Sequence, residues 1–151
     1  MASRRRSREF ALQILYRLDL AGADPERALA GLWEGQLEDD ALSNRPAEAE
    51  EIEFTRRLVL GYAEQKSEVN ALIESASVNW RLLRMPVVDR NILRLASFEL
   101  LACSDIPASV SINEAVELAK RFGDQDSRAF INGILDRIAT ETGRGGRQGR
   151  R

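Results

Sequence analysis

Four arginines crowd the start of the chain, where a first helix is expected from about Ser3 to Leu20. They are Arg4, Arg5, Arg6 and Arg8. At about 100° per residue, Arg5 and Tyr16 fall on one flank of that helix, with Arg4 and Arg8 beside them. Guanidinium groups bind phosphates and aromatic rings stack on bases, so this flank has the chemistry of single-stranded RNA binding. Two simpler interpretations stay open: a solvated arginine end, and Tyr16 as an edge residue of the core.

Little else in the sequence suggests a reactive group. The chain has no histidine, which removes the commonest general base and metal ligand, and its one cysteine cannot form an internal disulfide. Cys103 lies in the apolar run LLAC, where a buried, inert thiol is expected. The acidic residues of 38–53 do not have the spacing of an ion-binding loop. With no P-loop, dinucleotide-binding glycine motif or CxxC pair, we expect neither a metal nor a cofactor.

Charge is segregated between the ends and the body of the chain. The net charge is −2, from 22 basic and 24 acidic residues, but eight of the basic residues are arginines at 4–8 and 144–151. Without them, 14 basic residues face 24 acidic ones, so the body is strongly acidic. The glycine- and arginine-rich residues 143–151 cannot pack and are expected to be a disordered tail. Such a tail adds salt-dependent affinity for RNA.

Apolar periodicity predicts helices along the rest of the chain and no strands. A second helix is expected over Pro25–Leu37 and a third within the region after Pro46. Pro86–Cys103 is apolar on almost all sides, which is typical of a central buried helix. Its Arg90 and Arg94 form a narrow polar strip whose simplest role is salt bridging. At 151 residues, with no membrane-span pattern or signal peptide, the sequence predicts one cytoplasmic domain over 1–142.

The segment from Ser111 to Ile138 predicts two helices and the hinge between them. Ser111 and Glu114 have the spacing of a capping box, and Gly123 stands where a helix ends in a left-handed residue. A second cap is available at Asp126 or Ser127.

A glycine inside the second of these helices needs a reason, because it costs about 1 kcal/mol relative to alanine. For Gly133 the simpler explanation is close packing against a neighbouring helix. The alternative is a bared backbone that a ligand or partner approaches.

Three blocks of this chain also resemble a known family. They are RRRSREFALQILY, VVDRNILRLASFELL and INEAVELAKRFG followed by DSRAFINGILDRI. In the same order and spacing, from about Arg4 to about Ile138, they resemble the NusB family of bacterial transcription antitermination factors. The resemblance implies an all-α fold, a compact bundle of about seven helices in two small packed sub-bundles. It also implies no catalytic activity.

The resemblance further implies partners. They are the boxA element of ribosomal RNA leader transcripts, the ribosomal protein that serves as NusE, and, indirectly, other Nus factors and elongating RNA polymerase. It leaves open whether the isolated chain is a monomer or a homodimer. By position, it implies RNA contacts from Arg4, Arg5, Arg6, Arg8, Gln13, Tyr16, Arg94, Asp126 and Phe130. Asp89, in the VDR element, falls where family members meet NusE or the RNA.

Two other functions remain as alternatives. NusB-like domains precede a methyltransferase domain in some RNA-modifying enzymes, but the sequence ends about a dozen residues after Ile138, which leaves no room for a cofactor-binding domain. The second alternative is a helical adaptor that contacts only proteins. Failure to bind boxA RNA in the presence of NusE would favour it.

Overall fold

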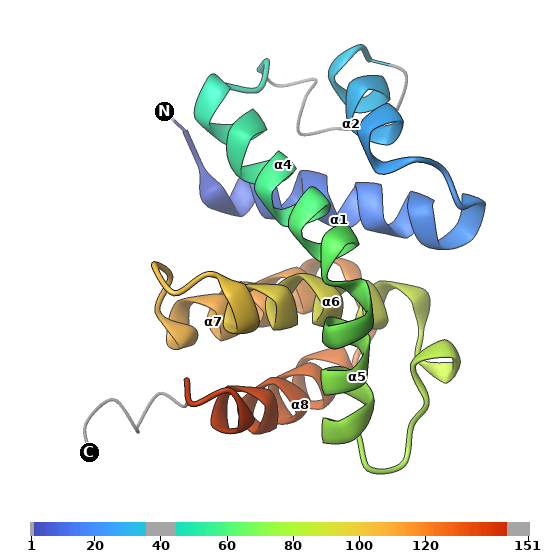
Figure 1. The fold of residues 1–151 in the computed structure, drawn as a ribbon, viewed down its shortest axis with the longest axis vertical. Helices are drawn as coiled ribbons and strands as arrows, with labels where there is room; N and C mark the ends of the chain where they lie inside the picture. The colour runs from blue at the N-terminus through green and yellow to red at the C-terminus, as the bar shows by residue number, and fades with distance from the viewer. Residues whose placement is uncertain (1, 36–44, 145–151) are drawn as a thin grey trace. The chain divides into compact units, whose positions relative to one another are not determined.

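The chain is all-α, as the sequence predicted. The computed structural model describes residues 2–35 and 45–144, and these residues form seven α-helices, one short 3₁₀ helix and no strand (Figure 1). They divide into two compact units, residues 1–64 and residues 65–151, each with its own helices. None of the described helices is long and apolar enough to cross a membrane.

The first unit contains α1 (Arg4–Ala21), α2 (Pro25–Trp33) and α4 (Ala49–Glu64). Helix α1 begins at Ser3, whose hydroxyl accepts a hydrogen bond from the Arg6 N–H, and ends at Gly22 with a φ of +67°. Helix α2 begins at Pro25 as expected, with Asp24 as its N-cap, but it ends at Trp33 rather than Leu37. Gly35 follows with a φ of +76°, a left-handed conformation that stops the helix.

The core of this unit lies between α1 and α4, which cross each other in Figure 1. Its fully buried side chains include Phe10, Ile14, Leu15, Leu29, Leu32 and Leu58. A polar seam also joins the two helices, because the Ser7 hydroxyl donates to the Glu51 carbonyl at 3.0 Å. This seam fixes the start of α1, with its arginines, against the first turns of α4.

The second unit contains α5 (Lys66–Ala76), the 3₁₀ helix η1 (Leu82–Arg84), α6 (Val87–Ala102), α7 (Ala108–Phe122) and α8 (Ser127–Glu141). Helices α5, α7 and α8 all pack on α6. Every residue of α6 from Asp89 to Leu100 is buried, so the prediction of a central buried helix is confirmed. Cys103, at its end, is buried as expected.

The predicted capping box at Ser111 is wrong. Helix α7 begins at Ala108, after Pro107, so Ser111 lies inside the helix rather than at its start. Its hydroxyl donates to the Glu99 carboxylate at 2.7 Å, and both residues are buried. A proline at the N-cap starts the helix earlier than the S-x-x-E pattern suggests, which frees the serine to satisfy a buried carboxylate on α6.

The end of the second unit is held to its body. Arg144 donates from Nη1 to the Leu100 carbonyl at 2.9 Å and from Nη2 to the Ile106 carbonyl at 2.5 Å. Residues 145–151 of the predicted tail, and residues 38–44 of the acidic region, lie outside the described residues.

Candidate nucleic-acid interface

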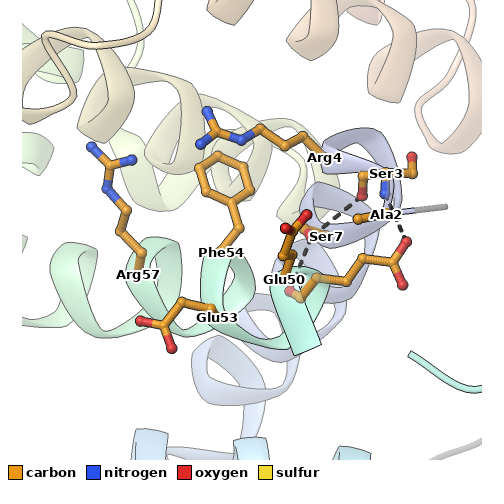
Figure 2. A pocket seen from close by; sticks show the side chains of 9 residues that line it. Ala2, Ser3, Arg4, Ser7, Glu50, Glu53, Phe54 and Arg57 are labelled. Carbon is orange, nitrogen blue, oxygen red and sulfur yellow. Dashed lines mark hydrogen bonds between the residues drawn. The ribbon is translucent and has the colours of Figure 1, made fainter. Parts of the chain in front are cut away.

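A pocket of about 450 Å³ opens between the start of α1 and the start of α4 (Figure 2). We call it the N-terminal pocket; it is lined by Ala2, Ser3, Arg4, Ser7, Glu50, Glu51, Glu53, Phe54 and Arg57. Two guanidinium groups, a buried phenyl ring and hydroxyls line it together with the carboxylates of Glu50, Glu51 and Glu53. Guanidinium groups bind the phosphates of a nucleic acid, so Arg4 and Arg57 have the chemistry to meet a phosphate here.

Phe54 is the centre of an arginine cluster. The Cζ atoms of Arg4, Arg8 and Arg57 lie 4.2, 5.3 and 6.0 Å from the centroid of its ring. In Figure 2 the side chains of Arg4 and Arg57 extend on different sides of the ring, one from each helix. The negative ring face attracts guanidinium groups, so Phe54 gathers charges that would otherwise repel one another.

These positions differ in what they can reach. Arg4 is exposed and Arg57 is half-buried, whereas Arg8 is only 3% exposed. Arg4 and Arg57 can therefore meet a ligand at the surface, while Arg8 supports the cluster from below. Sequence reasoning did not single out Phe54 or Arg57. Their i, i+3 spacing on α4 is visible in the sequence, but nothing in it indicates that α4 packs beside the arginine start.

Arg6 is buried, and its guanidinium forms contacts within the first unit. It is 9% exposed, and its Nη1 lies 2.8 Å from the Glu51 carboxylate. The same guanidinium also donates to the carbonyls of Arg45 and Pro46. A direct phosphate contact by Arg6 would require this buried pairing to break, which is costly.

Glu51 collects the hydrogen bonds that hold the pocket together. Its carboxylate accepts from the N–H groups of Ser3 and Glu48 at 2.8 and 2.9 Å, and from the guanidinium of Arg45 at 2.7 Å. The hydrogen bond from Arg45, reinforced by those two backbone N–H groups and the Arg6 charge, lowers the pKa of Glu51 to about 2 against the opposing effect of burial. The carboxylate thus stays ionised and ties the start of α1 to α4.

The remaining predicted residues of α1 lie toward its surface. Arg5 is exposed, Tyr16 is 40% exposed and Gln13 is half-buried. Tyr16 is therefore not a residue of the closed core, and part of its side chain is accessible to a ligand.

Arg94, on α6, lies inside the second unit. It is 7% exposed and donates to the side-chain oxygens of Asn70 at 3.2 Å and Asn91 at 2.9 Å. These bonds link α5 to α6. The geometry thus places Arg94 in hydrogen bonds within the second unit, which agrees with the simpler, structural interpretation of the polar strip.

Asp89 is likewise buried, at 4% exposure, and accepts a hydrogen bond from the Ser127 hydroxyl at 2.7 Å. Burial, and secondarily the nearby Asp124 charge, raises the pKa of its carboxyl against the lowering effect of the Ser127 hydrogen bond. Ser127 Oγ in turn accepts from the Asp124 N–H at 3.0 Å. This network fixes the start of α8. Asp89 therefore faces α8 rather than a partner at the surface.

Gly123 does not end α7 in a left-handed conformation. Its φ is −90° and its ψ is −175°, so the prediction based on helix ends is wrong. The glycine is needed for space instead, because a Cβ there would lie 2.5 Å from Ser127 Oγ and 2.9 Å from the Ala119 carbonyl. Its missing side chain lets Ser127 approach and make the network with Asp89.

The hydrogen bonds among Asp89, Ser127 and Asp124 lie next to two predicted RNA-binding residues, Asp126 at the N-cap of α8 and Phe130 in its first turn. Asp126 is exposed and Phe130 is half-buried. The ring of Phe130 meets Trp80 edge to face, with centroids 6.0 Å apart. Gly133 lies one turn farther along α8, and no atom lies within 4 Å of the position of its missing Cβ. Close packing therefore does not explain this glycine, and the simpler interpretation from the sequence is wrong.

The chemistry of these surfaces is that of binding. No group of three acidic, cysteine or histidine residues among the described residues is arranged to hold a metal ion. What the two units present instead are arginine guanidinium groups next to aromatic rings. Such pairs bind the backbone and bases of nucleic acids without bond making.

Comparisons with known proteins point in the same direction. The model of the NusB family matches residues 5–140. The transcription antitermination protein NusB of Myxococcus xanthus is 49% identical over 139 residues, which cover 92% of this chain and 96% of that protein. NusB of Anaeromyxobacter dehalogenans is 47% identical over 141 residues, covering 93% of each.

Solved structures show the same fold. A structure of T. maritima NusB superposes with a TM-score of 0.82 at 37% identity and covers 100% of both chains. A chain from a crystal structure of the antitermination factors NusB and NusE in complex with dsRNA superposes with a TM-score of 0.78 at 26% identity, covering 91% of this chain and 96% of that one.

Proposed function

Because the chain belongs to the NusB family of transcription antitermination proteins, we propose that it binds boxA RNA of ribosomal RNA leader transcripts together with NusE. In this proposal it acts within a Nus-factor complex on elongating RNA polymerase. Support comes from the similar chain that was solved with NusE and RNA. The activity is assembly: the protein adds binding energy between RNA and protein partners and makes or breaks no covalent bond.

The observation that carries the proposal is the arginine cluster around Phe54. The Arg4 guanidinium lies 4.2 Å from the ring centroid, is exposed, and stands at the mouth of the N-terminal pocket. A ring that holds guanidinium groups at its faces orients them before any ligand arrives, which lowers the entropic cost of binding. Arg4 and Arg57 can thus meet a phosphate group without first being ordered.

Each group has a distinct part in the proposed binding. Arg4, Arg5 and Arg57 attract phosphates, an effect that weakens as salt rises. Tyr16 stacks on a base, and so adds affinity that depends little on sequence. Arg6 and Arg8, which are buried, hold the helix ends that display these groups.

Asp126, at the N-cap of α8, and Phe130, in its first turn, provide the second surface for RNA. The carboxylate of Asp126 accepts hydrogen bonds from bases, and the ring of Phe130 supplies a surface on which a base can stack. Buried Asp89 and Arg94 act on this surface indirectly, by fixing the helices that carry it.

The proposal is tested by RNA binding over a salt series, with and without NusE. Arg4→Ala and Arg57→Ala are expected to weaken binding of single-stranded boxA RNA. Each should reduce the slope of log K against log salt by about 0.7 for every phosphate that the variant no longer neutralises. Arg27→Ala is the matched control, since Arg27 is an exposed arginine on α2 of the same unit.

The result that would overturn the proposal is equally definite. If Arg4→Ala and Arg57→Ala bound RNA with the affinity and salt slope of Arg27→Ala, the N-terminal pocket would not be the RNA site. If the wild-type chain bound NusE but no boxA RNA under any of these conditions, a protein-only adaptor would be the better account.

A further inference from the structure

A second pocket lies within the C-terminal unit, between the segment that follows α5 and one face of α8. Its volume is about 230 Å³, and we call it the aromatic slot, after its lining residues Ser77, Trp80, Phe130, Gly133 and Arg137. Pockets that enclose whole small molecules measure about 300–1,000 Å³. The aromatic slot is smaller, and its size suits a single planar ring that enters from a longer ligand.

Part of the lining of the slot is bare backbone, at Gly133. Gly133 stands in the middle of α8, and a Cβ there would meet no atom within 4 Å. Alanine would therefore fit and would favour the helix by about 1 kcal/mol. A glycine that packing does not require, in the lining of a pocket, indicates that the empty space itself is used.

One lining residue of the slot has a polar atom without a partner. The hydroxyl of Ser77 is buried, at 5% exposure of the residue, and its Oγ makes no hydrogen bond in the described structure. Buried hydroxyls are nearly always paired, because leaving one unpaired costs free energy. A ligand that brings a hydrogen-bonding edge into the slot would satisfy this group.

The walls of the slot are aromatic and open to solvent on one side. Trp80 is 48% exposed, and its plane makes an angle of 75° with that of Phe130. Because the rings meet edge to face, they do not stack on each other, and the exposed part of Trp80 remains available to a ligand. Arg137 donates to the Ala76 carbonyl at 2.6 Å and so braces the far wall.

We propose that the aromatic slot receives one unstacked base of a bound single-stranded RNA. The base stacks on Trp80 and exchanges a hydrogen bond with the hydroxyl of Ser77. This inference rests on the proposed RNA-binding function and extends it, since neither Trp80, Ser77 nor Gly133 is needed for the N-terminal pocket.

Charge and chemistry favour a base over a protein side chain. The segment Ser77–Arg84 contains two arginines, Arg81 and Arg84, and no carboxylate, and both are exposed. Their charge suits a phosphate backbone running past the slot. An aliphatic side chain would fill the slot but leave Ser77 unpaired, whereas a base has both a flat face and a polar edge.

The test measures binding of a fluorescein-labelled single-stranded boxA RNA to the full chain with NusE present. Base–aromatic stacking contributes about 1–3 kcal/mol per base, so Trp80→Ala should weaken binding by about 5- to 150-fold. Trp80→Phe keeps a stacking face and should recover most of the affinity. RNA should also quench tryptophan emission of the wild type, and this quench should disappear in Trp80→Phe.

Gly133 separates a role in binding from a role in folding. Gly133→Leu fills the slot and should weaken RNA binding as Trp80→Ala does. Gly133→Ala should melt at the same or a higher temperature than the wild type, because its Cβ meets no atom. Ser77→Ala should lose affinity without a loss of melting temperature, since no bond within the protein is removed.

The outcomes distinguish this inference from the proposed function. If Arg4→Ala weakened binding while Trp80→Ala, Ser77→Ala and Gly133→Leu bound RNA like the wild type, the slot would not hold a base, and the function would stand. If the slot variants lost affinity for NusE alone, the slot would be a protein contact and the inference would be wrong. If the wild type bound no RNA, both would fail.

Discussion

Replacing Glu51 with glutamine is expected to destabilise the N-terminal unit by about 2 kcal/mol at neutral pH. The carboxylate accepts hydrogen bonds from two backbone N–H groups, those of Ser3 and Glu48, and from the guanidinium groups of Arg6 and Arg45. A glutamine side chain keeps one acceptor oxygen, but it turns an NH₂ group toward donors and removes the negative charge. The buried Arg6 then loses its ion pair with Glu51.

The magnitude follows from the pKa of the Glu51 carboxyl. Its fall from 4.5 to about 2 on folding corresponds to about 3 kcal/mol at about 1.36 kcal/mol per pH unit. The largest contribution comes from Arg45, whose side chain is 37% exposed. Solvent screens that part of the interaction, which reduces the expected loss to about 2 kcal/mol.

The assay is chemical denaturation of wild type and Glu51→Gln at a series of pH values. A carboxyl with a lowered folded-state pKa stabilises the fold above its unfolded pKa and loses that effect as pH falls. The gap between the two proteins should thus be full at neutral pH and should close between about pH 4.5 and pH 2. Glu50→Gln is the matched control, because Glu50 is the exposed neighbour on α4.

Two results would refute this reasoning. One is a Glu51→Gln protein as stable at neutral pH as Glu50→Gln. The other is a loss of stability that stays constant as the pH falls, which would place the effect in packing rather than in the ionised carboxylate.

Two further predictions concern the start of α8. Gly123→Ala should cost about 1–3 kcal/mol in thermal or chemical unfolding, because its Cβ would lie 2.5 Å from Ser127 Oγ and 2.9 Å from a backbone carbonyl; an unchanged stability would mean that α8 shifts freely. Burial raises the pKa of the Asp89 carboxyl, so its contribution favours the fold at low pH and is lost as pH rises through the folded-state pKa. Asp89→Asn keeps an oxygen for Ser127 and should gain stability relative to wild type as the pH rises above the ordinary aspartate pKa of about 4, and a difference independent of pH would contradict it.

Much of the fold was predictable because helices are specified locally. Apolar spacing and caps placed α1 and the start of α2, and the apolar character of 86–103 identified the central helix. The errors came where one local signal competed with another. Pro107 started α7 before the S-x-x-E pattern at Ser111, and a glycine typical of helix ends proved to serve a neighbouring helix instead.

The sequence indicated the type of chemistry at the candidate site, but it did not show which residues form the site. Arginines and an aromatic residue on α1 indicated RNA-binding chemistry, yet sequence does not distinguish a buried arginine from an exposed one. Arg6 is paired with Glu51, 45 positions away, whereas Arg4 lies over Phe54 and remains exposed. These partners belong to another helix, and local periodicity carries no information about them.

The sequence by itself determined the all-α class, the family, the absence of histidine chemistry and the basic start of the chain. Tertiary structure alone decided which arginines stay available, because burial and ion pairing depend on how α1 packs on α4. It also decided the meaning of Gly133. The sequence does not distinguish a helical glycine that packs against a neighbouring helix from one that lines a pocket. Only the surrounding atoms show that the space beside Gly133 is open.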